Sequence, residues 1–208
     1  MKTRFLLIFL VSFILIFSVL NSRFVIANVK FWALNKTIPP PIASSNPLPI
    51  EPNKAEPNKK LILPDKALLV INSIGVSAPI IFGVGSNTKN IYNNLENGVV
   101  HYSDTPKPGM NGVSIILGHS SAYPWYKGAY GSVFALLGKL KVGDKIYVKY
   151  EDGQTFVFSV KQSIIFSPFA KDNRLAEIEK SEKPTLVLIS CWPVGTNYKR
   201  IAVQAELE

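Results

Sequence analysis

Short apolar runs separated by turn residues fill the chain from residue 61 to residue 208 and limit the folds open to it. Valine, isoleucine, phenylalanine and tyrosine dominate these runs, and these residue types favour β-strands. Three shorter stretches look helical, and residues 150–154, YEDGQ, have the composition of a hairpin turn. The pattern predicts an all-β barrel or sandwich with short inserted helices around a single core. The predicted strands span 67–81, 113–119, 145–150, 155–166, 185–191 and 200–207, and the predicted helices span 87–96, 133–139 and 174–180.

The N-terminus is apolar and basic. Lys2 and Arg4 precede an uncharged run at residues 5–20, which is slightly shorter than the roughly 17–20 residues that span a bilayer. Basic residues ahead of such a run favour a cytoplasmic N-terminus and an exported body. We therefore expect residues 1–35 to form a signal anchor and the rest to lie outside the cell, on a single-pass membrane protein. A signal peptide cleaved near residues 25–27 remains the alternative.

Residues 36–64 hold eight of the fifteen prolines and predict an extended spacer between the anchor and a folded domain at residues 65–208. The net charge of +9 lies mostly ahead of that domain, because residues 1–60 carry 8 Lys/Arg against 2 Asp/Glu. A nucleic-acid-binding domain would concentrate its basic residues in the fold, so we expect no nucleic-acid partner. One cysteine and two histidines are too few for a structural metal site, and we expect no cofactor.

The single cysteine, Cys191, closes the apolar run TLVLIS and precedes a turn rich in proline and glycine. Arg200 opens the next predicted strand. If the two strands form a hairpin, Arg200 lies near Cys191, where it would favour a thiolate and donate to an oxygen that develops charge. A free cysteine is often only a small buried hydrophobe, so the residues alone leave both interpretations open.

The two histidines, His101 and His119, each lie near the end of a predicted strand. His119 follows the strand at residues 113–117 and Gly118, so it too lies where a strand meets a loop. A thiolate nucleophile needs a proton donor and acceptor near neutral pH, and histidine meets that need; a plain surface histidine is the alternative. His101 lies at a strand end before a long loop, either as a second pocket histidine or as a support that hydrogen-bonds that loop.

Together these segments resemble the sortases, membrane-anchored cysteine transpeptidases of bacterial surfaces, with a subclass similar to class D or E. The resemblance covers residues 67–208. Four motifs carry it in order: IGVSAPI at 74–80, GVVHYSDTPKPGMNGVSIILGH at 98–119, FALLGKLKVGDKIYV at 134–148 and TLVLISCWPVGTNYKRIAV at 185–203.

The resemblance implies a sortase-type closed β-barrel of about eight strands. It implies that Cys191 is the nucleophile, His119 the general acid and base, and Arg200 the residue that positions substrate and stabilises the oxyanion. The implied reaction cleaves a C-terminal LPxTG-like sorting signal through a thioacyl enzyme and transfers the protein to an amine of a cell-wall precursor or a pilin lysine. The further candidates for substrate binding are His101, Ser120, Ser190 and Trp192.

The chain departs from the family pattern in places. Ser190 stands where threonine is common, and an aromatic insert at residues 123–134 forms either a loop packed over the barrel or a pocket rim. An L,D-transpeptidase would place an arginine two residues after its cysteine, and a papain-like hydrolase would have its cysteine at the start of a helix. Neither pattern matches the residues around Cys191, which closes a predicted strand. A non-catalytic surface-binding module on the same barrel remains the alternative function.

Overall fold

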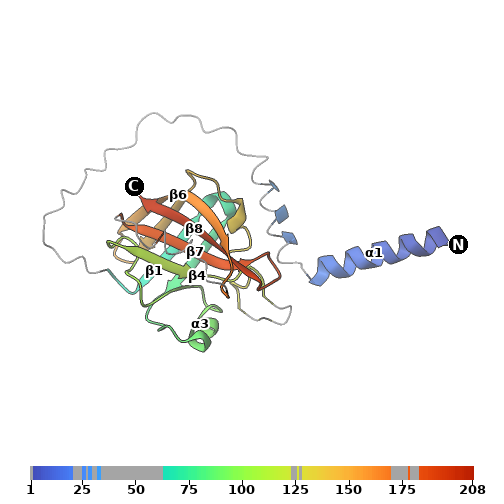
Figure 1. Cartoon of the computed structure of the whole chain (residues 1–208), viewed down its shortest axis with the longest axis horizontal. Coiled ribbons are helices and arrows are strands. Elements are labelled where there is room, and N and C mark those ends of the chain that lie inside the picture. The colour runs from blue at the N-terminus through green and yellow to red at the C-terminus, as the bar shows by residue number, and fades with distance from the viewer. Residues whose placement is uncertain are drawn as a thin grey trace, which may run out of the picture.

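The computed structural model describes residues 2–20, 25–26, 28–29, 32–33, 63–122, 126, 128–169, 178 and 183–208. Helix α1 (Lys2–Leu20) precedes a closed β-barrel, and the short helix α3 (Thr88–Asn94) lies outside the barrel wall (Figure 1). The apolar side chains of α1 are largely exposed. Among the described residues, no helix is both long and apolar enough to cross a bilayer. The anchor at 1–35 stays a prediction, and nearly all of the predicted linker at 36–64 lies outside the described residues.

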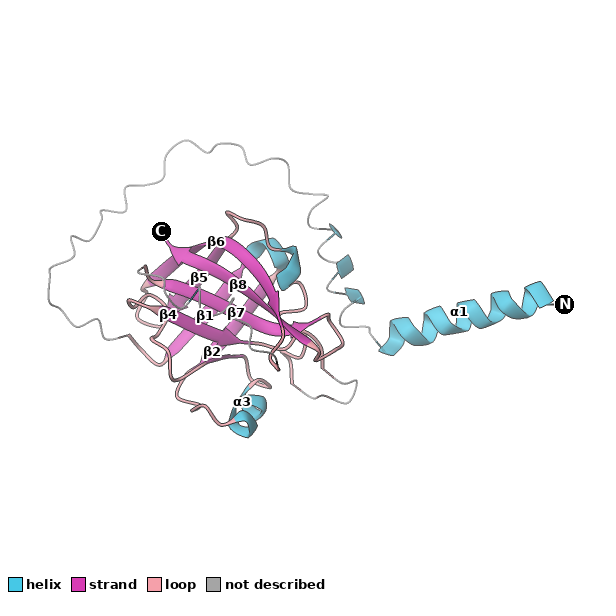
Figure 2. Ribbon diagram, in the orientation of Figure 1, coloured by secondary structure: helices cyan, strands magenta, loops and turns pink. Residues whose placement is uncertain are grey.

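Eight strands close into one barrel in the order β1-β2-β3-β4-β7-β8-β6-β5, with β5 pairing back onto β1 (Figure 2). Two neighbouring pairs, β2 with β3 and β4 with β7, are parallel, and the others are antiparallel. The predicted eight-stranded closed barrel is confirmed. The strands are β1 (Lys66–Ile71), β2 (Val76–Ile81), β3 (Val99–His101), β4 (Val113–Leu117), β5 (Lys145–Tyr150), β6 (Thr155–Phe166), β7 (Thr185–Trp192) and β8 (Lys199–Leu207).

The barrel wall at β7 is buried on both faces. Leu186 and Leu188 point into the main core, whereas Val187 and Ile189 belong to a second cluster on the outer face. Ile178, which is 2% exposed, packs into that outer cluster. A strand covered on both sides is apolar at nearly every position rather than at alternate ones, which explains the unbroken run TLVLIS.

Local residues explain where the elements begin and end. The predicted strand at 67–81 is two strands, because the 3-10 turn η1 (Asn72–Ile74) and Gly75, at φ 66°, separate β1 from β2. The predicted helix at 87–96 is α3 (Thr88–Asn94), and the side chain of Asn87 caps it by accepting from the Lys89 N–H at 2.9 Å.

The two other predicted helices are those at residues 133–139 and 174–180. Of the stretch at 133–139, only η2 (Leu137–Lys139) is helical, as a 3-10 turn. The stretch at 174–180 lies outside the described residues, apart from Ile178. The predicted hairpin turn is confirmed, since the Tyr150 N–H donates to the Gln154 carbonyl at 2.8 Å between β5 and β6.

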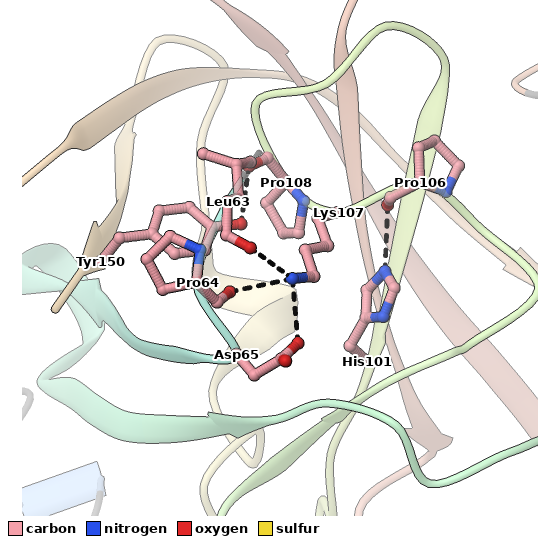
Figure 3. Close-up of polar contacts among 8 residues, drawn as sticks. All are labelled: Leu63, Pro64, Asp65, His101, Pro106, Lys107, Pro108 and Tyr150. Carbon is pink, nitrogen blue, oxygen red and sulfur yellow. Dashed lines mark hydrogen bonds and ion pairs between the residues drawn. The ribbon is translucent and has the colours of Figure 1, made fainter. Parts of the chain in front are cut away.

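The loop between β3 and β4 is fastened to the barrel at several points (Figure 3). The His101 imidazole bonds to the Pro106 carbonyl at 2.9 Å, and the buried Tyr150 hydroxyl donates to the Pro108 carbonyl at 2.9 Å. The Lys107 ammonium donates to the carbonyls of Leu63 and Pro64 and pairs with the Asp65 carboxylate at 2.9 Å. These contacts tie the start of the domain to the loop that leads into β4.

Candidate active site

Cys191 and Arg200 are directly opposite each other in the antiparallel β7–β8 pair. Residues paired in this way have Cα atoms about 4.5–5.5 Å apart and side chains on the same face of the sheet. Side chains two residues apart on a strand point to the same face of the sheet. Cys191 therefore shares the outer face with Val187 and Ile189, and Arg200 shares it with Ala202. The hairpin predicted from the sequence therefore forms, and it brings the cysteine and the arginine together.

His119 follows β4, which pairs in parallel with β7. Leu117 is paired with Ile189, and the Gly118 N–H donates to the Ile189 carbonyl at 3.1 Å. Strand β4 ends at Leu117, and a continuation of this register for two more residues would set His119 opposite Cys191. Cys191 is thus paired with Arg200 on β8, and His119 lies two residues past the end of β4, the strand on the other side of β7.

Backbone and hydroxyl contacts fix this seam between β4 and β7. The buried Ser190 hydroxyl donates to the Gly118 carbonyl at 2.7 Å, so the residues immediately before Cys191 and His119 are bonded to each other. Past the strand ends, the Gly195 N–H donates to the Ser121 hydroxyl at 3.1 Å. The segments that follow the cysteine and the histidine are therefore tied as well.

Phe134, the last residue of the aromatic insert, supports His119. Its N–H donates to the His119 carbonyl at 2.9 Å, and its ring lies where a Cβ at Gly118 would stand. A larger residue at position 118 would have to displace this fully buried ring. Glycine before His119 is thus needed for packing as well as for turning the chain.

The imidazole of His119 is partly enclosed by two tyrosines. The ring of Tyr126 meets it edge-on, with centroids 5.4 Å apart, and the ring of Tyr92 on α3 lies 6.1 Å away. Burial lowers the pKa of His119 below its ordinary value, and the Glu96 carboxylate opposes this by raising the pKa. Burial therefore favours the neutral imidazole, which is the form that can accept a proton.

The guanidinium of Arg200 faces the β7–β8 loop. Its Nη1 donates hydrogen bonds to the carbonyls of Asn197 and Lys199, at 3.0 Å each. The side chain is half-buried, and it shares the outer face with the half-buried Cys191. A planar guanidinium carries further N–H donors on Nη2 and Nε, which suit a carbonyl oxygen or an oxyanion.

The remaining candidates occupy different environments. His101 is 4% exposed, pairs with the inward-facing Ile116 and packs against Phe82, with ring centroids 5.1 Å apart. It therefore lies on the inner face of the barrel wall, bonded to its loop and away from the outer face that carries Cys191. Ser120 is buried at 2% exposure beside His119. Trp192 packs over Gly138 and Ile201 at the edge of the core.

Sequence reasoning missed Tyr92 and Glu96 as neighbours of His119. Both come from the segment of α3 and the turn that follows it, more than twenty residues before the histidine. The aromatic insert was noticed, and Tyr126 from it does reach the site. No group of three or more His, Cys, Asp or Glu side chains that could hold a metal ion occurs in the part of the chain that the structure describes.

The sequence from residue 69 to residue 208 matches the family model of the sortase domain. The chain belongs to the sortase family. It is 29% identical over 139 residues to sortase D of Bacillus subtilis (strain 168), an alignment that covers 65% of this sortase and 60% of the relative. This sortase thus spans about 60% of the length of the curated relative it matches.

Solved structures give the same result. Sortase C-1 of Actinomyces oris is 29% identical, with a TM-score of 0.54 over 68% of this sortase and 72% of that chain. The Sortase D5 transpeptidase of Clostridium perfringens is 28% identical, with a TM-score of 0.53 over 69% and 79% of the two chains. The family and the closed barrel fold are therefore established together, with a class D relative among the matches.

Proposed function

We propose that this protein is a cysteine transpeptidase that cleaves a C-terminal LPxTG-like sorting signal and joins the released protein to an amine at the cell surface. The observation that supports this proposal is the pairing of Cys191 with Arg200 between β7 and β8, with His119 two residues past the end of β4, the strand on the other side of β7. A nucleophile, a group that exchanges protons and a cation beside them are the parts that acyl transfer requires.

The reaction would run in two halves. The Cys191 thiolate attacks the scissile carbonyl carbon, and the resulting oxyanion is stabilised by an N–H of Arg200. The protonated imidazole of His119 gives its proton to the leaving amine as the C–N bond breaks, which leaves a thioester on Cys191. An incoming amine then attacks the thioester, loses a proton to His119, and releases the Cys191 thiolate with a new amide bond.

The other candidates take supporting roles in this proposal. Ser190 positions the strand of Cys191 through its bond to Gly118, and His101 holds the loop that leads to β4. Ser120 and Trp192, which are buried or half-buried, would shape the inner side of the site. With residues 1–35 as a membrane anchor and 36–64 as a spacer, the barrel would face the outer surface, where substrate proteins and acceptor amines are found.

A peptide-library assay tests the proposal. The full-length chain is incubated with sorting-signal peptides, with and without amine acceptors, and products are read by mass spectrometry. We expect cleavage, an acyl adduct on Cys191, and a transfer product only when an amine is present. Cys191→Ala should abolish all three while keeping the circular dichroism spectrum. Cleavage that survives in Cys191→Ala would assign the reaction to another residue, and a wild-type chain that binds peptides without forming the adduct would indicate a binding module.

A further inference from the structure

Two elements outside the barrel wall meet at His119. Tyr92 belongs to α3, whose start is capped by Asn87, and Glu96 follows the same helix. Tyr126 belongs to the aromatic insert between β4 and β5. These two elements are far apart in the sequence, and both contact the ring of the proposed general acid and base.

Gly128 is the point at which the insert docks onto the α3 side. A Cβ at Gly128 would stand 2.7 Å from both Cε1 and the hydroxyl oxygen of Tyr126, and 2.8 Å from the Cα of Glu96. Real side chains do not approach this closely, so the backbone at this position fits between the Tyr126 ring and the Glu96 backbone only because it carries no side chain. The position of Tyr126 over His119 therefore depends on a tight backbone contact that an alanine would disturb.

We propose that Tyr92 and Tyr126 are positioning residues that fix the orientation of the His119 imidazole and shield it from water, and that the docking of the insert at Gly128 sets this arrangement. This inference rests on the proposed function, because orientation matters only if His119 transfers protons. An aromatic ring that meets the imidazole edge-on restricts its rotation, and loss of a productive orientation by about 1 Å can lower a rate about a hundredfold.

The charged and titratable groups around His119 allow the two effects to be separated. They are Glu96 after α3, Tyr92 on α3 and Tyr126 on the insert. Removing a ring uncovers the imidazole and should raise its pKa, since burial is what lowers it. Removing the Glu96 charge should lower the pKa further, so Tyr126→Ala and Glu96→Gln act in opposite directions.

The test follows His119 by NMR titration of its imidazole protons in the full-length chain in detergent, with His101→Gln used to assign the two histidines. Tyr126→Ala and Gly128→Ala should both raise the His119 pKa and reduce kcat about tenfold or more at unchanged KM. Tyr126→Phe, which keeps the ring, should recover the kcat lost in Tyr126→Ala. Tyr198→Ala, a change at an exposed tyrosine of the β7–β8 loop, should leave the His119 pKa as it is.

The inference is overturned if Tyr126→Ala and Gly128→Ala fold as the wild type does and leave both the His119 titration and the pH profile of kcat unchanged. Equal loss of kcat in Tyr126→Phe and Tyr126→Ala would also overturn it, because the ring would then not be the feature that matters. Failure of the proposed function is distinguishable: the wild type would cleave no peptide, while the His119 titrations would still respond to the tyrosine changes.

Discussion

Ser190 and Gly118 are joined across the parallel seam of the barrel, with the serine hydroxyl 2.7 Å from the glycine carbonyl oxygen. Each of the two residues immediately precedes a proposed catalytic residue. The contact is buried, so water cannot readily replace it. The spacing between β4 and β7 at the site is therefore fixed by a side-chain hydrogen bond as well as by the backbone hydrogen bonds of the sheet.

Ser190→Ala should therefore lower both stability and activity. The lost hydrogen bond is expected to cost about 0.5–1.5 kcal/mol of unfolding free energy, and kcat should fall more than KM rises. Urea unfolding and a peptide-cleavage assay measure the two effects. Ser190→Thr keeps the hydroxyl and serves as the matched control. If alanine and threonine at position 190 gave the same kcat, the hydroxyl would have no positioning role.

Arg200→Ala should lower kcat about 10²–10³-fold, which is the usual loss when a donor to an oxyanion is removed. Arg200→Lys restores the charge but not the planar fork, so we expect only part of the activity to return. The exposed neighbour Lys199 provides the control, because Lys199→Met changes the local charge by the same amount. A loss of equal size in Lys199→Met would mean that general positive charge, and not the guanidinium, is responsible.

Lys107→Met should loosen the start of the domain. The ammonium contacts two carbonyls and the Asp65 carboxylate, and its side chain is only 25% exposed, so we expect a loss of about 1–2 kcal/mol in unfolding free energy. Hydrogen exchange should also quicken in β1. Lys66→Met removes an exposed ion pair with Glu151 and should cost less than about 0.5 kcal/mol. Comparable losses in the two variants would contradict a special role for Lys107.

Stability should fall in acid because of His101. Burial lowers the pKa of His101 below its ordinary value, and the charge of Lys107 lowers it too, against the bond to the Pro106 carbonyl, which raises it. The unfolded chain therefore binds this proton more readily than the folded chain does. The contribution of His101 to stability is fully present above the ordinary histidine pKa of about 6.5 and is lost as the pH falls below it.

His101→Gln is the variant that checks this pH dependence. The difference in unfolding free energy between about pH 7.5 and about pH 5 should be smaller in His101→Gln than in the wild type. His119→Gln should reduce the difference as well, because burial lowers the pKa of His119 in the same direction. An unaltered difference in His101→Gln would show that His101 does not carry the acid sensitivity.

The strands and the Cys191–Arg200 pair could be predicted because their signals are local. Apolar β-branched runs indicate strands, and the short turn after Cys191 makes a hairpin with the strand of Arg200 the simplest connection. The break at Gly75 was hidden by the apolar residues on both sides of it. Residues 72–73, Asn and Ser, together with that glycine, were the available turn signal.

The approach of β4, which leads to His119, to the strand that carries Cys191 has no local signal. It depends on the parallel pairing of β4 with β7, and such pairing joins segments separated by a long crossover. The contacts of Tyr92 and Glu96 with His119 have the same origin, since they follow from how α3 packs outside the wall. The inward position of His101 follows from its pairing with Ile116, whereas the sequence left its two interpretations open.

The parallel seam has a consequence for how the protein can vary. His119 and Cys191 are set by strands β4 and β7, while the long connection between those strands contains the aromatic insert, η2, β5 and β6. Insertions in the exposed parts of that connection can reshape the approach to the cysteine without altering the register of the two strands. Selectivity can then diversify, or be grafted from another protein, on a reaction centre whose spacing stays constant.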